Sequence, residues 1–280
     1  MKKAMIWVAL GLMTLGIVLF VGLGISVDFD FSRCSNVNYV TNTYDFLEDF
    51  HSIDMETITA DIDFRLAEDG VCRIVCYERE NMRHDVAVKD GVLTILGRDT
   101  RSWMDHISIF NWEMPCITVY LPAGEYQSVQ IGNTTGDVKM LGSWSFEDLK
   151  VKTTTGDIKL GEVVCKNTVS TRVSTGDILL EGVTCGSLEA RGTTGDVTLQ
   201  DVISSGSMKI QHTTGDITLN RCDAGELTLE ASTGDIEAIL LSEKTVTAKT
   251  TTGDVDVPKG TSGGRCDVTT TTGDICIRIP

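Results

Sequence analysis

A repeated Thr-Gly-Asp turn dominates the second half of this 280-residue chain. The tetrapeptide Thr/Ser-Thr-Gly-Asp occurs eight times between about Val129 and Pro280, and successive glycines are 20, 20, 19, 20, 19, 19 and 20 residues apart. A fixed period of this length is typical of a solenoid, in which each coil buries its apolar face against its neighbours. The repeated pairs are Gly136-Asp137, Gly156-Asp157, Gly176-Asp177, Gly195-Asp196, Gly215-Asp216, Gly234-Asp235, Gly253-Asp254 and Gly273-Asp274.

Apolar residues alternate with polar ones on both sides of each turn. A β-branched residue stands two positions after every glycine and a second apolar residue two positions later, as in Ile158 and Leu160. Positions −7 and −5 from the glycine repeat the pattern, as in Leu149 and Val151. This period of two is typical of strands with one buried face. Each coil is therefore expected to contain two strands, a loose corner and a sharp turn.

The turn residues suit this geometry. Glycine adopts a positive φ without steric cost, and aspartate accepts hydrogen bonds from nearby backbone N–H groups. We predict an all-β, single-stranded β-solenoid of 19–20-residue coils over residues 126–280, with right-handed coiling.

A hydrophobic segment stands at the N-terminus. Lys2 and Lys3 precede 24 uncharged residues from Ala4 to Val27, a length sufficient for one transmembrane helix. A cleaved signal peptide, which usually has a shorter apolar region, is the alternative. The flanking charges predict a cytoplasmic tail at residues 1–3, an anchor at 4–27 and an extracytoplasmic body.

Residues 28–125 are expected to form a juxtamembrane spacer followed by an N-terminal β module that caps the solenoid. Thr59-Ala60-Asp61-Ile62 resembles a degraded repeat turn, which suggests a first coil or a capping module. Asp90-Gly91 between two apolar runs predicts a β-hairpin. Trp103, His106 and Trp112 lie in an aromatic loop and are candidate contacts for a partner or a glycan, with packing of the cap as the alternative.

Composition restricts the partners. The net charge of −16 argues against nucleic acid and against an anionic membrane surface, and it predicts a rigid acidic surface.

The eight stacked aspartates permit two interpretations. They are structural turn residues, or they form a row of oxygen ligands for calcium, the one cofactor that the sequence suggests. We favour the structural interpretation, in which backbone N–H groups and threonine hydroxyls hold the carboxylates. The threonine columns are also reminiscent of ice-binding solenoids, but residues such as His212 interrupt them.

Nine cysteines leave at least one thiol unpaired within the chain. Cys165 and Cys185 lie nine residues after their glycines and are expected to stack on adjacent coils within disulfide reach. The sequence is compatible both with free structural thiols and with disulfides. No zinc site is expected, because no clustered ligands stand at zinc spacing.

An enzymatic role is not supported by the sequence. Catalytic β-helices place acids and bases in a cleft made by inserted loops, whereas every period here is 19 or 20 residues. We expect no catalytic residues, and we expect His212 to be an inner or corner residue.

Several motifs together resemble the bacterial "putative adhesin" family of envelope β-helix proteins. They are the N-terminal anchor, the Tyr39–Tyr44 segment, the Thr-Ala-Asp-Ile stretch, the Cys72–Glu78 strand and the Thr-Gly-Asp ladder. The resemblance covers nearly the whole chain and implies an adhesin-like or envelope-stress role without established catalytic residues. We therefore expect a non-catalytic surface module that binds cell-wall polymer, a surface glycan or an envelope protein. A structural or sensory component of an envelope-stress response, bound to partner membrane proteins, is the alternative, and a carbohydrate-active enzyme is a weaker one.

Overall fold

This computed structural model describes residues 2–26, 38–100, 113–260 and 262–279; in the first helix the described side chains are those of residues 11–22, 25 and 26. The chain divides into two compact units. One contains Met1–Tyr39 and Thr100–Glu113, and the other contains Val40–Asp99 and Met114–Pro280. The two units are described separately.

The N-terminal unit contains helix α1 (Lys2–Ser26), and its described apolar side chains are exposed. Among the residues whose side chains are described, no helix is both long and apolar enough to cross a membrane. The transmembrane anchor expected at 4–27 therefore stays a prediction.

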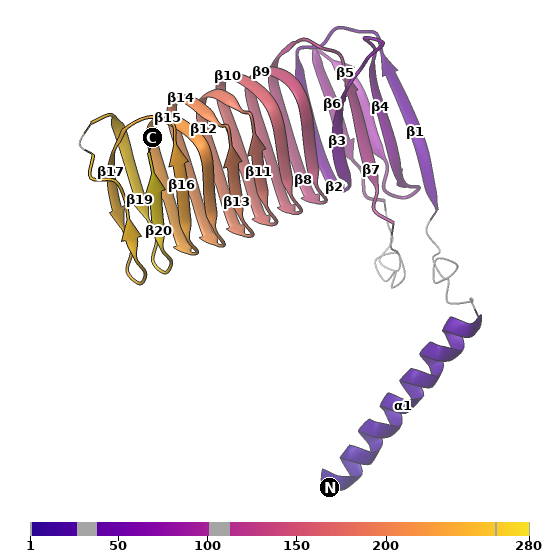
Figure 1. The fold of residues 1–280 in the computed structure, drawn as a ribbon. Coiled ribbons are helices and arrows are strands. Elements are labelled where there is room, and N and C mark those ends of the chain that lie inside the picture. Colours follow the sequence, from indigo (N-terminus) through magenta and orange to yellow (C-terminus); the bar gives the residue numbers. More distant parts are fainter. Residues whose placement is uncertain (1, 27–37, 101–112, 261, 280) are drawn as a thin grey trace. The chain divides into compact units, whose positions relative to one another are not determined.

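The second unit confirms the all-β solenoid, which makes about eight turns (Figure 1). Its described strands belong to one hydrogen-bonded sheet that winds through the whole unit. The strands before the repeats are β1 (Tyr39–Phe46), β2 (Ser52–Thr59), β3 (Asp61–Leu66), β4 (Cys72–Arg79), β5 (His84–Lys89), β6 (Val92–Gly97) and β7 (Cys116–Leu121). Those of the repeats are β8 (Glu125–Thr135), β9 (Val138–Thr155), β10 (Ile158–Thr175), β11 (Ile178–Glu181), β12 (Thr184–Thr194), β13 (Val197–Gln200), β14 (Ile203–Thr214), β15 (Ile217–Thr233), β16 (Ile236–Leu240), β17 (Lys244–Lys249), β18 (Val255–Asp256), β19 (Gly264–Thr269) and β20 (Ile275–Arg278).

Coils stack in register through parallel strands. Ile158 pairs with Val138 of the preceding coil and with Ile178 of the following coil, and all three are fully buried. The inward positions of successive coils thus form continuous apolar columns along the axis. The alternation read from the sequence follows directly, because successive side chains of a strand point to opposite faces.

The repeat glycines make the sharp corner possible. All eight have a positive φ between 123° and 141°. A Cβ atom on Gly195 would lie 2.2 Å from the carbonyl oxygen of Gly176 in the neighbouring coil. A side chain at this position would therefore meet both an unfavourable φ and the backbone of the next coil.

At the C-terminal end the coils do not stack in chain order. The last coil, β19 and β20, pairs with β15 and β16 on one side and with β17 and β18 on the other. The final segment is thus inserted between the two coils that precede it in the sequence. The inserted coil buries Cys266, Val268, Ile275 and Ile277, whereas Val255 in the outer coil is 44% exposed. The more apolar coil occupies the inner place.

The N-terminal end shows a comparable insertion. Strands β2 and β3 lie between β8 and β9 on one side and β6 and β7 on the other. The coil with the degraded turn is therefore an inner coil of the solenoid, and the module boundary expected at residue 125 stays a prediction.

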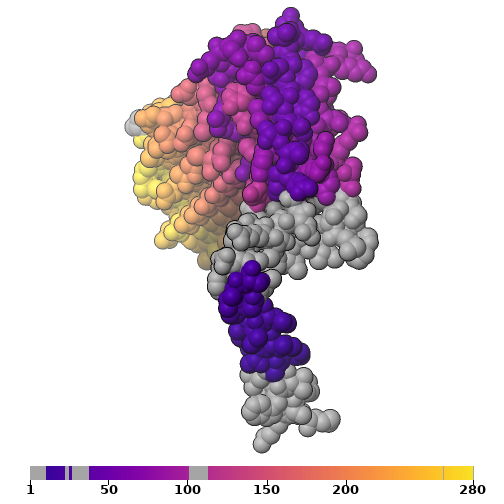
Figure 2. Space-filling model, turned by 90° about the vertical axis from the view of Figure 1, so that its right-hand side faces the viewer, coloured from indigo at the N-terminus to yellow at the C-terminus, as the bar shows by residue number. Residues whose placement is uncertain are grey.

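Antiparallel strands cover this end. Strand β5 pairs with β6 through the expected Asp90-Gly91 hairpin, whose two turn residues have φ values of 52° and 75°. Strand β4 pairs antiparallel with β7, and β1 pairs with β4. Strands β1 to β7 form the surface at this end, in violet to magenta (Figure 2). At the opposite end, β17 pairs only with β19 among the described strands.

Candidate functional site

The repeat aspartates form a hydrogen-bonded ladder at one corner of the solenoid. The Oδ1 atom of each repeat aspartate except Asp254, the last in the stack, accepts a hydrogen bond from the backbone N–H of the aspartate in the next coil, at 2.7–3.0 Å. Asp61 of the degraded turn begins the ladder by accepting from Asp137. The stacking order is Asp61, Asp137, Asp157, Asp177, Asp196, Asp216, Asp235, Asp274 and Asp254.

The ladder uses its carboxylates to join the coils. The backbone N–H of Asp177, helped by the ammonium group of Lys159, holds the pKa of Asp157 below its usual value, against the opposing effect of burial. Lys139 and Lys159 also form ion pairs with Asp137 and Asp157. In the part of the chain that the structure describes, no three ladder carboxylates come close enough to hold a metal ion. These hydrogen bonds are those that the structural interpretation of the aspartate row expects, and the calcium interpretation stays a prediction.

A second column lies just inside the same corner, three residues before each glycine. Its polar members donate hydrogen bonds to a glycine carbonyl at 2.6–3.3 Å: Asn133 and Thr153 to Gly136, His212 to Gly195, Thr250 to Gly273 and Thr270 to Gly234. His212 is thus a buried corner residue, as expected, and its Nε2 atom carries the proton because both of its partners are carbonyl oxygens.

The column is interrupted at Gly192. The imidazole of His212 occupies the space that a side chain at Gly192 would fill, since a Cβ atom there would lie 2.3 Å from its Nδ1. His212 is 5% exposed, and its Nδ1 has no hydrogen-bond partner among the described residues. A buried polar atom without a partner is costly to the stability of the fold.

Cations line up on the outer side of the strands next to this column. Lys152 pairs in register with Arg172, and Arg172 pairs with Arg191, so three cations occupy equivalent positions on adjacent coils. All three are exposed. We call Lys152, Arg172 and Arg191 the basic row. The net charge of −16 predicted an acidic surface, and this face departs from it because one outward position carries the same charge on three consecutive coils.

Three shallow hollows follow one another along the basic row, with volumes of about 260, 480 and 360 Å³. The first and second share Lys150 and Lys152, and the second and third share Arg172 and Arg191. Gly132 and Gly192, which carry no side chain, lie in the two outer hollows. The hollows therefore form one furrow along the solenoid axis, and His212 lines its far end.

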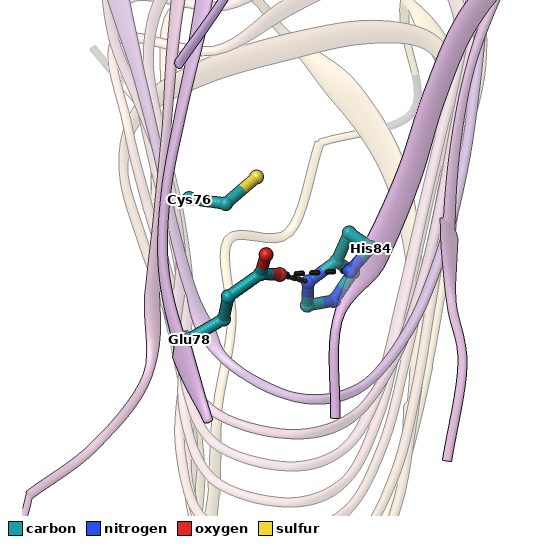
Figure 3. Close-up of side chains that lie close together, drawn as sticks. All are labelled: Cys76, Glu78 and His84. Carbon is teal, nitrogen blue, oxygen red and sulfur yellow. Dashed lines mark hydrogen bonds and ion pairs between the residues drawn. The ribbon is translucent and has the colours of Figure 1, made fainter. Parts of the chain in front are cut away.

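The N-terminal cap contains a buried polar cluster of Cys76, Glu78 and His84 (Figure 3). Glu78 accepts hydrogen bonds from the backbone N–H of His84 at 2.7 Å, from its Nδ1 at 2.7 Å and from Asn42 at 2.6 Å. Their ligand atoms lie within 4.8 Å of one another, so these three side chains could hold a metal ion. Three protein donors already satisfy the carboxylate, however.

The eight cysteines in the described residues are free thiols. Cys165 and Cys185 occupy paired positions on adjacent coils, as expected, and both are buried. Burial raises the pKa of Cys72 and Cys76 to about 12. These thiols pack as small apolar side chains.

Sequence reasoning and the structure identify different sites. Trp103, His106 and Trp112 lie outside the described residues, so their proposed contact role stays a prediction. The sequence did not indicate the polar cluster of the cap, because Glu78 lies in β4 and His84 in β5, and the two side chains meet only when these strands are folded together. The basic row was also missed, although Lys152, Arg172 and Arg191 each stand four residues before a repeat glycine. Aligning the coils by their glycines would have revealed it.

The chain was compared with known proteins. No curated protein matches it. A solved structure of a putative adhesin from Bacteroides fragilis is 19% identical, with a TM-score of 0.56, and the match covers 87% of this chain and 98% of that one. A putative adhesin from Parabacteroides distasonis is 13% identical, covering 86% and 97%, with a TM-score of 0.49. The family model Toastrack DUF4097 matches residues 50–280, and the chain therefore belongs to this family.

Proposed function

We propose that this protein is a non-catalytic, membrane-anchored β-solenoid that acts as an adhesin-like interaction module of the cell envelope. The observation that carries the proposal is the furrow beside the basic row. It is shallow, it crosses several coils, and its lining repeats from coil to coil. Such a surface suits an extended polymer better than a small substrate, which proteins usually enclose in a single deep pocket.

The furrow does not resemble an active site. Its lining offers cations, hydroxyl groups, one imidazole and three carboxylates, and each carboxylate lies in a different hollow: Glu56, Glu189 and Glu230. Glu189 pairs with Arg191, and Glu230 accepts a hydrogen bond from Gln211. A hydrolase or lyase needs an acid and a base positioned around one reacting bond. The similar structure from Bacteroides fragilis is described as that of a putative adhesin, which agrees with a binding role.

The proposed location rests on the N-terminal sequence. Lys2 and Lys3 followed by the uncharged run to Val27 support an anchor with a cytoplasmic N-terminus and an extracytoplasmic body. The solenoid would then be presented outside the membrane. Its ligand would be cell-wall polymer, a surface glycan or another envelope protein.

The proposal is tested by sedimentation of the full chain, kept in a non-ionic detergent, with isolated cell-wall polymer. We expect saturable co-sedimentation that survives a calcium chelator, because the ladder carboxylates are hydrogen-bonded within the fold. Loss of binding in the presence of the chelator would favour the interpretation of the aspartate row as a calcium site. No binding with or without calcium would refute the polymer-binding role and favour the envelope-stress alternative, in which membrane proteins are the partners.

A further inference from the structure

We propose that the basic row and its furrow bind a linear acidic polysaccharide that runs along the solenoid axis across several coils. The inference rests on the proposed function and specifies the chemical class of its ligand. The polymer's carboxylates would lie over Lys152, Arg172 and Arg191, and its hydroxyl groups would contact the polar side chains between them.

The charges of the row have few partners within the protein. In the described part of the chain, Lys150, Lys152 and Arg172 form no ion pair, whereas Arg191 pairs with Glu189. Adjacent strands lie about 4.8 Å apart, and like charges opposite each other destabilise a sheet. A folded protein gains nothing from three neighbouring cations in register, but an anionic polymer would neutralise them together.

The row differs from the other cations on the repeats, most of which have a carboxylate partner; among the described residues Lys209, Lys249 and Lys259 also form no ion pair, but they line none of the three hollows. Lys139, Lys159 and Lys166 each have a carboxylate partner, namely Asp137, Asp157 and Glu147. The unpaired cations Lys150, Lys152 and Arg172 instead share one hollow of about 480 Å³. Positive charge without a partner is therefore concentrated where the surface is also concave.

The furrow supplies the contacts that a sugar requires besides charge. Its lining includes the hydroxyl groups of Thr154, Ser170, Thr193, Thr213 and Ser232. Carboxylates for the cations and hydroxyl groups for these side chains occur together in an acidic polysaccharide.

Other polyanions fit less well. Single-stranded nucleic acid is usually held by aromatic side chains on which the bases stack, and none of the residues that line the three hollows is Phe, Tyr or Trp. A second copy of this chain could also offer negative charge, because its aspartate ladder has the same coil spacing as the basic row. In that ladder, however, one oxygen of each bonded carboxylate already accepts a hydrogen bond from the next coil. A polysaccharide matches both the charge and the hydroxyl groups of the furrow.

The test compares two triple variants of the full chain in non-ionic detergent. The row variant is Lys152→Gln, Arg172→Gln and Arg191→Gln, and the control is Lys139→Gln, Lys159→Gln and Lys166→Gln. Both lose three positive charges, so they separate the row from net charge. Binding of polygalacturonate oligomers is measured by calorimetry, with neutral dextran, polyphosphate and single-stranded DNA as further probes. Thermal unfolding of each variant establishes that it is folded.

We expect polygalacturonate to bind the wild type with an affinity that rises with oligomer length and falls with salt. The row variant should bind at least tenfold more weakly, the control within about twofold of wild type, and dextran not detectably. A row variant that binds like the control would overturn the inference, as would stronger binding of DNA or polyphosphate than of polygalacturonate. Self-association of the wild type that the row variant abolishes, without polymer binding, would instead assign the row to a second copy.

This result is separable from the proposed function. If both triple variants still sediment with cell-wall polymer as the wild type does, the envelope-binding role stands and the basic row is not its site. If the wild type binds neither cell-wall polymer nor polygalacturonate, both ideas fail.

Discussion

Replacing a repeat glycine by alanine should destabilise the solenoid far more than the backbone conformation alone requires. Gly195 has a φ of 123°, and such a conformation costs a residue with a side chain roughly 1–3 kcal/mol. The new Cβ atom would also lie 2.2 Å from the carbonyl oxygen and 2.6 Å from the carbonyl carbon of Gly176. Backbone atoms cannot rotate away as a flexible side chain can, so the two coils must separate locally.

Separation would weaken three hydrogen bonds between coils. Gly176 donates to the carbonyl of Thr194 at 3.0 Å, Ile178 donates to the carbonyl of Asp196 at 2.9 Å, and Asp196 donates to the carboxylate of Asp177 at 2.8 Å. Each such bond contributes about 0.5–1.5 kcal/mol. With two of them lost in addition to the conformational cost, Gly195→Ala should lower the free energy of unfolding by about 2–6 kcal/mol.

Two control glycines separate the contributions. Gly142 also has a positive φ, 131°, but the nearest atom to a Cβ there is Nε1 of Trp144 at 3.5 Å, so Gly142→Ala should cost only the conformational term of about 1–3 kcal/mol. Gly161 has no positive φ, and its Cβ would contact only the exposed Leu141, 3.1 Å from Cδ2 and 3.8 Å from its Cα. Gly161→Ala should therefore change stability by less than about 1 kcal/mol.

The assay is urea unfolding of the full chain followed by far-ultraviolet circular dichroism, with the slope of each transition compared between variants. An equal slope allows the midpoints to be read as stability differences. If Gly195→Ala is no more destabilising than Gly142→Ala, the close approach of neighbouring coils does not limit the turn, and the packing argument is wrong.

Three further predictions concern single side chains. Thr171 is 1% exposed and its hydroxyl has no partner among the described residues, so Thr171→Val should raise the free energy of unfolding by about 1 kcal/mol, and an unchanged or lower urea midpoint would show that the hydroxyl is satisfied. The folded-state pKa of Asp157 is lowered, so its carboxylate stabilises the fold above the unfolded pKa of about 4, and this contribution is lost as pH falls through the folded value. Asp157→Asn keeps an acceptor oxygen but cannot titrate, so the stability of this variant should fall less steeply below pH 4 than that of the wild type. Urea unfolding measured from pH 2.5 to 6 tests this, and the same loss of stability at acid pH in both proteins would contradict it. Burial raises the pKa of Cys185, Cys222 and Cys266 to about 11, so iodoacetamide at pH 8 should label them only in urea, and mass spectrometry that finds them labelled in the folded chain would show that the coils open readily.

Net charge was a poor guide to the surface of this protein. The value of −16 is a property of the whole chain, whereas a solenoid sorts its residues into rows by their position in the repeat. Lys152, Arg172 and Arg191 are far apart in the sequence, and the register of the coils places them side by side. The charge that a polymer would meet is that of one row.

The sequence by itself determined the coil. Glycine at a positive φ, aspartate at the turn and alternating apolar residues act within a few residues, so each repeat shows its strands and corner without reference to the rest of the fold. The buried positions of Ile158 and Leu160 and the paired positions of Cys165 and Cys185 follow from that local pattern.

Only the tertiary structure decided how the coils are ordered and what they bring together. Every coil offers nearly the same row of backbone donors and acceptors, so hydrogen bonding does not specify which coil is its neighbour. At the C-terminal end, the coil with Ile275 and Ile277 lies inside and the coil with the exposed Val255 lies outside, an order that buries more apolar surface. The cluster of Glu78 and His84 and the furrow at His212 likewise depend on contacts between strands, which the local pattern does not contain.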